Sequence, residues 1–146
     1  MKIVDTNLLI YAYVPALEHH AAAKRWFEET LTADESVGLA WVSVLGFIRV
    51  VTNPRIFRVP LLLDRAAAVV DEWFQQQSVE VVLPTPRHWS TLREMLTLGQ
   101  ASGALTTDAH VAALAIEHGA TLYTTDRDFA RFPGVRVVNP LAGRGV

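Results

Sequence analysis

The chain has 146 residues and a net charge of −2 at pH 7. Its length fits one domain over residues 1–146, and its surface as a whole does not attract polyanions. Apolar residues make up 51% of the sequence and cysteine is absent, which favours a packed core and excludes a disulfide framework, a thiolate metal site and a cysteine nucleophile. A chain without cysteine suits the reducing cytoplasm. The longest uncharged run, 36–48, is too short to span a bilayer, so no membrane segment is expected.

Short apolar runs alternate with stretches of helical periodicity along the chain. The predicted strands are 2–4, 36–40, 79–83, 120–123 and 135–138, and the predicted helices are 8–13, 18–31, 41–51, 64–76, 87–98 and 108–118. We expect Asp64 to cap the helix that it begins, Thr106 or Thr107 to cap the last helix, and Gly119 to end it. This alternation is typical of an α/β fold with a mostly parallel sheet of about five strands, flanked by helices on both faces.

Four aspartates are placed differently from the acids on predicted helix surfaces. Asp5 follows the first strand, Asp126 follows the fourth, Asp128 comes two residues later, and Asp108 opens the last helix. The carboxyl ends of parallel strands meet at one edge of the sheet, where ligands bind, so we expect these acids to share a site. Each also has a structural interpretation, as a helix-dipole partner for Asp108 and as turn or capping residues for Asp5 and Asp126.

Crowded carboxylates repel one another, and one of them must hold a proton unless a cation is present. An all-oxygen ligand set in a chain without cysteine favours Mg²⁺ or Mn²⁺. Such a cation activates water and stabilises charge on a phosphodiester. The aspartates therefore predict metal-dependent hydrolysis of a phosphodiester by an activated water.

Four segments carry a family resemblance, in chain order: Ile3-Val4-Asp5-Thr6-Asn7 and the residues up to 12, the run 47–55, Leu105-Thr106-Thr107-Asp108 and the residues up to 115, and Thr124-Thr125-Asp126-Arg127-Asp128-Phe129. The chain resembles PIN-domain proteins, and most closely the VapC ribonuclease toxins of bacterial toxin–antitoxin pairs. The resemblance implies an endoribonuclease that depends on Mg²⁺ or Mn²⁺, acts on RNA, forms a homodimer and is inhibited by a cognate antitoxin.

The same resemblance implies roles for individual residues. Asp5, Asp108 and Asp126 are expected to bind the metal, and Asp128 is expected to act as an accessory acid. Asn7 and Thr125 are expected to orient carboxylates or water.

One position departs from the family pattern. Many members have a glutamate in the helix after the second strand, where this chain has Gly46. Glycine offers no ligand, so we expect one cation to be held well and a second poorly, with Ser43 or a water as a partial substitute. Nearby, Arg49 and Arg55, with Arg58, are either RNA phosphate contacts or a solvated helix end and loop.

Two alternatives remain open from the sequence. The first is a catalytically weak module that binds RNA or a partner without cutting, which Gly46 favours. The second is a metal-dependent nuclease that acts on DNA, which the absence of an added duplex-holding domain disfavours. No serine–histidine–acid constellation is evident, and His110 is expected at the surface.

Overall fold

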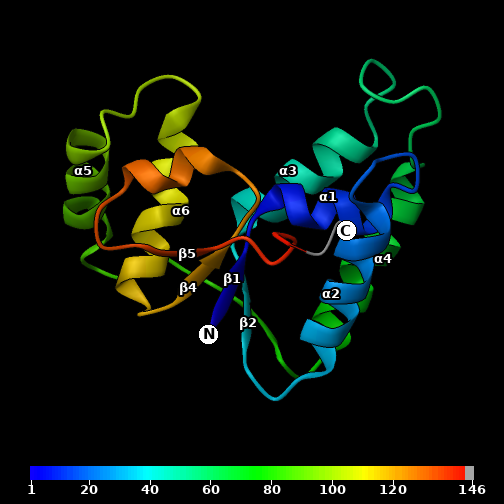
Figure 1. The fold of residues 1–146 in the computed structure, drawn as a ribbon, viewed down its shortest axis with the longest axis horizontal. Helices are drawn as coiled ribbons and strands as arrows, with labels where there is room; N and C mark the ends of the chain where they lie inside the picture. Colours follow the sequence, from blue (N-terminus) through cyan, green and yellow to red (C-terminus); the bar gives the residue numbers. More distant parts are fainter. Residues whose placement is uncertain (144–146) are drawn as a thin grey trace.

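The computed structural model describes residues 1–143, so the last three residues of the expected 1–146 domain lie outside the described part. A central sheet has helices on both sides (Figure 1). Its strands are all parallel, in the order β3-β2-β1-β4-β5. They are β1 (Lys2–Val4), β2 (Val37–Leu39), β3 (Val79–Val81), β4 (Thr121–Tyr123) and β5 (Arg136–Val138). The predicted α/β class and parallel sheet are confirmed.

The helices follow the predicted segments closely. They are α1 (Thr6–Tyr13), α2 (His20–Thr32), α3 (Trp41–Val51), α4 (Leu63–Gln75), α5 (His88–Leu98) and α6 (Leu105–Glu117), with a short 3₁₀ helix, η1 (Arg127–Arg131). The glycine predicted to end α6 does follow it: Gly119 comes after the capping residue His118 and has a φ of 60°, a conformation that glycine adopts at little cost.

Two predicted N-caps are wrong. The cap of α4 is Leu62, and Asp64 lies inside the first turn, where its charge favours the helix dipole without accepting a capping bond. The cap of α6 is Ala104, so Thr106 and Thr107 lie within the helix. The Thr106 hydroxyl donates to the carbonyl of Gly103 at 2.8 Å, back onto the preceding turn, as hydroxyls inside helices often do.

The core is divided by the sheet into two apolar clusters. Helices α1 to α4 cover one face and α5 and α6 cover the other (Figure 1). Adjacent side chains of a strand point to opposite faces, so Ile3 packs with the α5–α6 cluster and Val4 with the α1–α4 cluster. Gly38 of β2 faces the α5–α6 side, where a Cβ would collide with Val82.

The connections reverse direction beside β1. From β1 the chain passes to β2 on one side, and it returns later to β4 on the other side. The carboxyl ends of β1 and β4 therefore flank the switch point, where open parallel sheets bind ligands. No described helix combines the length and apolar character needed to cross a membrane.

Candidate active site

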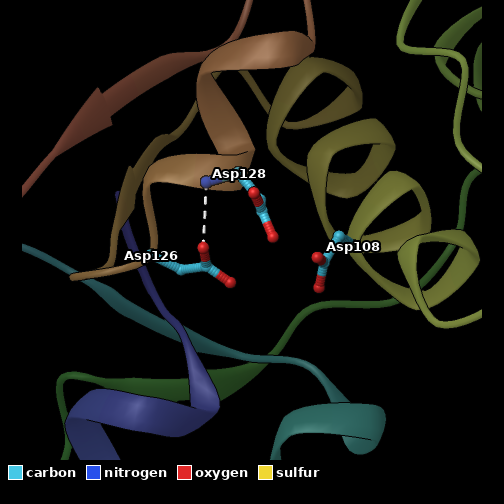
Figure 2. Close-up of side chains that lie close together, drawn as sticks. All are labelled: Asp108, Asp126 and Asp128. Atoms are coloured by element: carbon cyan, nitrogen blue, oxygen red, sulfur yellow. Dashed lines mark hydrogen bonds between the residues drawn. The ribbon is translucent and has the colours of Figure 1, made fainter.

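The ends of β1 and β4 place Asp5 and Asp126 beside each other. Asp5 directly follows β1, and its Oδ1 accepts the backbone amide of Thr6 at 2.9 Å, which caps α1. Asp126 caps η1 in the same way, since its Oδ1 accepts the backbone amide of Asp128 at 2.9 Å (Figure 2). Both aspartates thus have the structural role that the sequence left open, and these bonds orient their carboxylates.

Three carboxylates converge in the space between η1 and α6. Figure 2 shows Asp126 and Asp128 from one side and Asp108 of α6 from the other. One oxygen from each lies within 4.8 Å of the others. Asp5 is outside this close group, but it lines the same cavity of ≈ 410 Å³ as Asp108 and Asp126. All four aspartates singled out in the sequence therefore lie at this edge of the sheet.

Thr124 is the residue that joins Asp5 to its surroundings. Its buried hydroxyl donates to Oδ2 of Asp5 at 2.8 Å. The same Oγ1 accepts the side-chain amide of Asn7 at 3.3 Å and the backbone amide of Asp126 at 3.0 Å. Asn7 therefore reaches the site through Thr124.

The sequence assigned this orienting role to the neighbouring Thr125. In the described part of the chain the Thr125 hydroxyl makes no hydrogen bond to an aspartate, whereas Thr124 does. Thr124 directly follows β4 and is buried, whereas Thr125 lies in the bend that comes next, and of the two only Thr124 bonds Asp5. The pair of identical residues gives no sequence signal for which of them does so.

The pKa values report the crowding of negative charge. Burial raises the pKa of Asp5, although the hydrogen bonds from Thr124 and Thr6 oppose this rise, and the charge of Asp126 adds to it. Burial also raises the pKa of Asp108 to about 6, with the charges of Asp5, Asp126 and Asp128 contributing and Arg131 opposing. The raised pKa values of Asp5 and Asp108 mean that the fully ionised cluster is disfavoured without a compensating cation.

Two buried oxygens in the same cavity support a bound ligand. Among the described residues, neither Oδ1 of Asn7 nor Oγ of Ser43 has a hydrogen-bond partner, and both residues line the cavity. A buried polar atom without a partner costs about 1–3 kcal/mol and calls for an ion, a water or a ligand. Carboxylate, amide and hydroxyl oxygens are hard donors, so this set fits Mg²⁺ or Mn²⁺ better than a softer metal.

Comparison with known proteins agrees with this geometry. The PIN-domain family model matches residues 2–135. The chain belongs to the PIN-domain family. Ribonuclease VapC37 of Mycobacterium tuberculosis is 43% identical over 142 residues, which make up 97% of this chain and 99% of that protein. Ribonuclease VapC33 of the same species is 37% identical with the same coverage of both chains.

Several solved structures have the same fold as this chain. Mycobacterium tuberculosis VapC20, described as a sarcin–ricin loop cleaving toxin, has a TM-score of 0.67 at 21% identity, covering 93% of this chain and 99% of that one. VapBC2 from Rickettsia felis, solved bound to a DNA fragment from their promoter, has a TM-score of 0.67 at 16% identity, covering 94% and 97%. At these identities the likeness establishes the PIN fold alone.

Gly46, where the sequence resemblance leads us to expect a glutamate, lies in the wall of the acidic cavity. A Cβ at this position would meet Cγ2 of Thr6 at 3.0 Å and Oγ1 of Thr6 at 3.1 Å. A larger side chain therefore requires Thr6 to move. The close group of acids lies between η1 and α6 and is formed by Asp108, Asp126 and Asp128.

The cationic residues divide into those near the acids and those away from them. Arg49 lines the acidic cavity, whereas Arg55 and Arg58 are exposed in the segment between α3 and α4 and are not part of its lining. The sequence did not single out Arg131, which lowers the pKa of Asp108 and donates to the carbonyl of Gly99 at 3.1 Å. Because Asp108 lies on the separate helix α6, the sequence around Arg131 does not indicate this interaction.

A polar network between α5 and α6 was also missed. The Thr85 hydroxyl and its backbone amide both donate to Oε1 of Glu117, at 2.6 and 3.0 Å. The ring of His88 bonds Oε2 of Glu117 through Nδ1 and reaches Nδ1 of His110 through Nε2, at 2.9 Å. His110 is therefore half-buried and not at the surface as predicted. Its partners come from distant segments, which the spacing around Asp108 does not reveal.

Proposed function

We propose that this chain is the toxin of a toxin–antitoxin pair and an endoribonuclease that hydrolyses RNA phosphodiester bonds with Mg²⁺ or Mn²⁺, in the cytoplasm where its substrate lies. The observation that carries the proposal is the gathering of four aspartates at the switch point of the sheet: Asp5, Asp108 and Asp126 line one cavity, and Asp128 joins Asp108 and Asp126 in a close group. The 43% identity to ribonuclease VapC37 over almost the whole of both chains supports the choice of RNA as substrate.

In this proposal Asp108, Asp126 and Asp5 hold the cation, and Asp128 completes the acidic group. When bound, the cation neutralises the carboxylates, polarises the phosphoryl oxygen and lowers the pKa of water. Asp128 is exposed and lies close to Asp108 and Asp126, and in this proposal it accepts a hydrogen bond from the attacking water, which fixes the direction of attack.

Other residues hold the substrate and the aspartates in place. Thr124 and Asn7 fix the carboxylate of Asp5 through the bonds described above. Arg49, in the cavity wall, pairs with a phosphate of the RNA. Arg55, outside the cavity, contacts a phosphate farther along the strand, which a chain with a net charge of −2 needs in order to bind RNA.

The structural neighbours support a protein partner. The Rickettsia felis and Salmonella typhimurium neighbours are VapBC proteins solved with DNA, and another neighbour is a toxin–antitoxin complex from Klebsiella pneumoniae. We propose a cognate antitoxin that covers the acidic cavity with a cationic segment, since positive charge relieves the repulsion among the aspartates. We also propose that the toxin forms a homodimer.

A parallel cleavage assay tests the proposal. The purified chain is incubated with single-stranded RNA and single-stranded DNA of the same sequence, with Mg²⁺ or Mn²⁺, and then with EDTA. We expect RNA to be cut, DNA to remain intact and EDTA to stop the reaction. Cleavage of DNA alone would indicate the DNA-directed alternative.

A second candidate, a module that binds without cutting, is favoured by Gly46, because the position offers no carboxylate. It predicts that RNA is retained on a filter with no product and that calorimetry detects no tight divalent site.

A further inference from the structure

An apolar groove adjoins the acidic cavity along α3. Its volume is ≈ 470 Å³, and its lining includes Val42, Leu45 and Ile48 of α3 and Thr107 of α6. Four residues belong to both the groove and the acidic cavity: Val42, Gly46, Arg49 and Thr107. The two spaces are therefore adjacent, and the shared residue that lacks a side chain is Gly46.

The α3 face that forms the groove is apolar but open to solvent. Val42, Leu45 and Ile48 follow one another at intervals of three residues, which places them along one side of the helix. The most exposed of them, Leu45, has 63% of its surface accessible. An apolar helix side exposed beside a polar cavity is typical of a binding surface and not of a core.

We propose that this groove binds the nucleobase of the nucleotide next to the scissile phosphate, and that Leu45 determines which base is preferred there. The inference rests on the proposed ribonuclease function. A phosphate bound at the aspartates carries its neighbouring nucleoside into the space that opens over Gly46. The volume suits a compact ligand, since binding pockets typically span about 300–1,000 Å³.

The chemistry of the groove fits a nucleobase. Every base has an apolar face that packs against apolar side chains, and here the side chains of Val42, Leu45 and Ile48 provide that surface. Arg49 lies at the boundary with the acidic cavity, where a guanidinium can pair with the linking phosphate or stack on the base. The hydroxyl of Thr107 offers one donor and two acceptors to a base edge.

A protein segment is the less favoured occupant. An amphipathic helix bound in a groove needs successive anchor sites spaced over two turns, whereas this groove shares four of its lining residues, the cationic Arg49 among them, with the acidic cavity. The observations therefore favour one nucleoside, and binding of an antitoxin in the groove becomes an outcome of the test.

The experiment maps cleavage on RNA with randomised positions around the cut and sequences the product ends. The variants are Leu45→Ala, which removes most of the apolar surface, and Leu45→Phe, which adds a ring for stacking. The control is Leu83→Ala, because Leu83 is similarly exposed, at 55%, and does not line the groove. We expect the base ratio at one position beside the cut to change by about 10-fold or more in the Leu45 variants. The Leu83 variant should keep the wild-type ratios.

Failure of the nucleobase subsite can be distinguished from failure of the ribonuclease proposal. If wild type cuts RNA and the Leu45 variants keep its base ratios, the nucleobase subsite is overturned. The same holds if the variants instead lose only the binding of an antitoxin. If wild type cuts no RNA with either cation, the ribonuclease proposal fails.

A binding measurement then tests whether the groove binds a nucleobase, independently of RNA cleavage. The four nucleoside 5′-monophosphates are titrated while the methyl NMR signals of Val42, Leu45 and Ile48 are followed. Base-dependent shifts at these methyl groups support the subsite, and their absence at millimolar nucleotide overturns it.

Discussion

Replacing Asp108 with asparagine should stabilise the metal-free protein at neutral pH. The pKa of Asp108 is raised from its ordinary 3.8 to about 6 by burial and by its acidic neighbours. A folded-state pKa above the unfolded value means that the protonated form favours folding, and this contribution is lost as pH rises from about 4 through 6. Fully expressed, the shift is worth about 3 kcal/mol. Because the side chain is only partly buried and solvent screens its charge, we expect about 1–1.5 kcal/mol.

Urea unfolding in EDTA at pH 7.5 and at pH 4 measures this difference. Asp108→Asn should raise the unfolding free energy at pH 7.5, equivalent to a gain of roughly 2–6 °C in Tm, and should have little effect at pH 4, where the folded carboxyl is already protonated. The control is Asp71→Asn, an exposed acid on α4. A change in stability that is the same at both pH values, or a loss at pH 7.5, would refute the reasoning.

Three further predictions concern the surroundings of the site. Thr124→Val removes the hydroxyl that donates to Asp5 and should lower Mn²⁺ affinity or RNA cleavage by about 10–100-fold, measured by calorimetry and initial rates, with Thr125→Val as the matched control. Glu117→Gln takes the charged acceptor from Thr85 and His88 and should lower the unfolding free energy by about 1–3 kcal/mol in urea; no loss would show that the network adds no stability. Gly38→Ala forces a Cβ against Val82 and should cost about 1–3 kcal/mol in the same assay, whereas an unchanged midpoint would mean that the core relaxes freely there.

The sequence was sufficient for the fold because its local patterns agree with one another. The run before Asp5 and the run before Asp126 are each apolar and short, and each stops at a polar residue, which predicts both a buried strand and its carboxyl end. Once the strands are parallel, the topology brings these ends together. The location of Asp5 and Asp126 at one edge of the sheet therefore followed from pattern alone.

Hydrogen-bond partners that depend on side-chain direction, or that come from distant segments, could not be predicted from the local sequence pattern. Thr124 and Thr125 are chemically identical, and only the orientation at the end of β4 decides which one bonds Asp5. His88 and Glu117 are 29 residues apart, so their bond depends on how α5 packs against α6. The start of α4 differs for a related reason, since its N-cap, Leu62, provides no side-chain hydrogen bond and tertiary packing outweighs capping preference.

The most direct test of the aspartate site compares RNA cleavage by wild type and by Asp126→Asn at saturating Mn²⁺. Asparagine keeps the oxygen that accepts the amide of Asp128, so the cap of η1 is retained while the charge at the cation is lost. We expect the rate to fall by about 100-fold or more, since a bound cation contributes several kcal/mol to charge stabilisation, with Asp64→Asn on α4 cleaving at the wild-type rate. A rate for Asp126→Asn within threefold of wild type would contradict the assignment of this cluster as the catalytic centre.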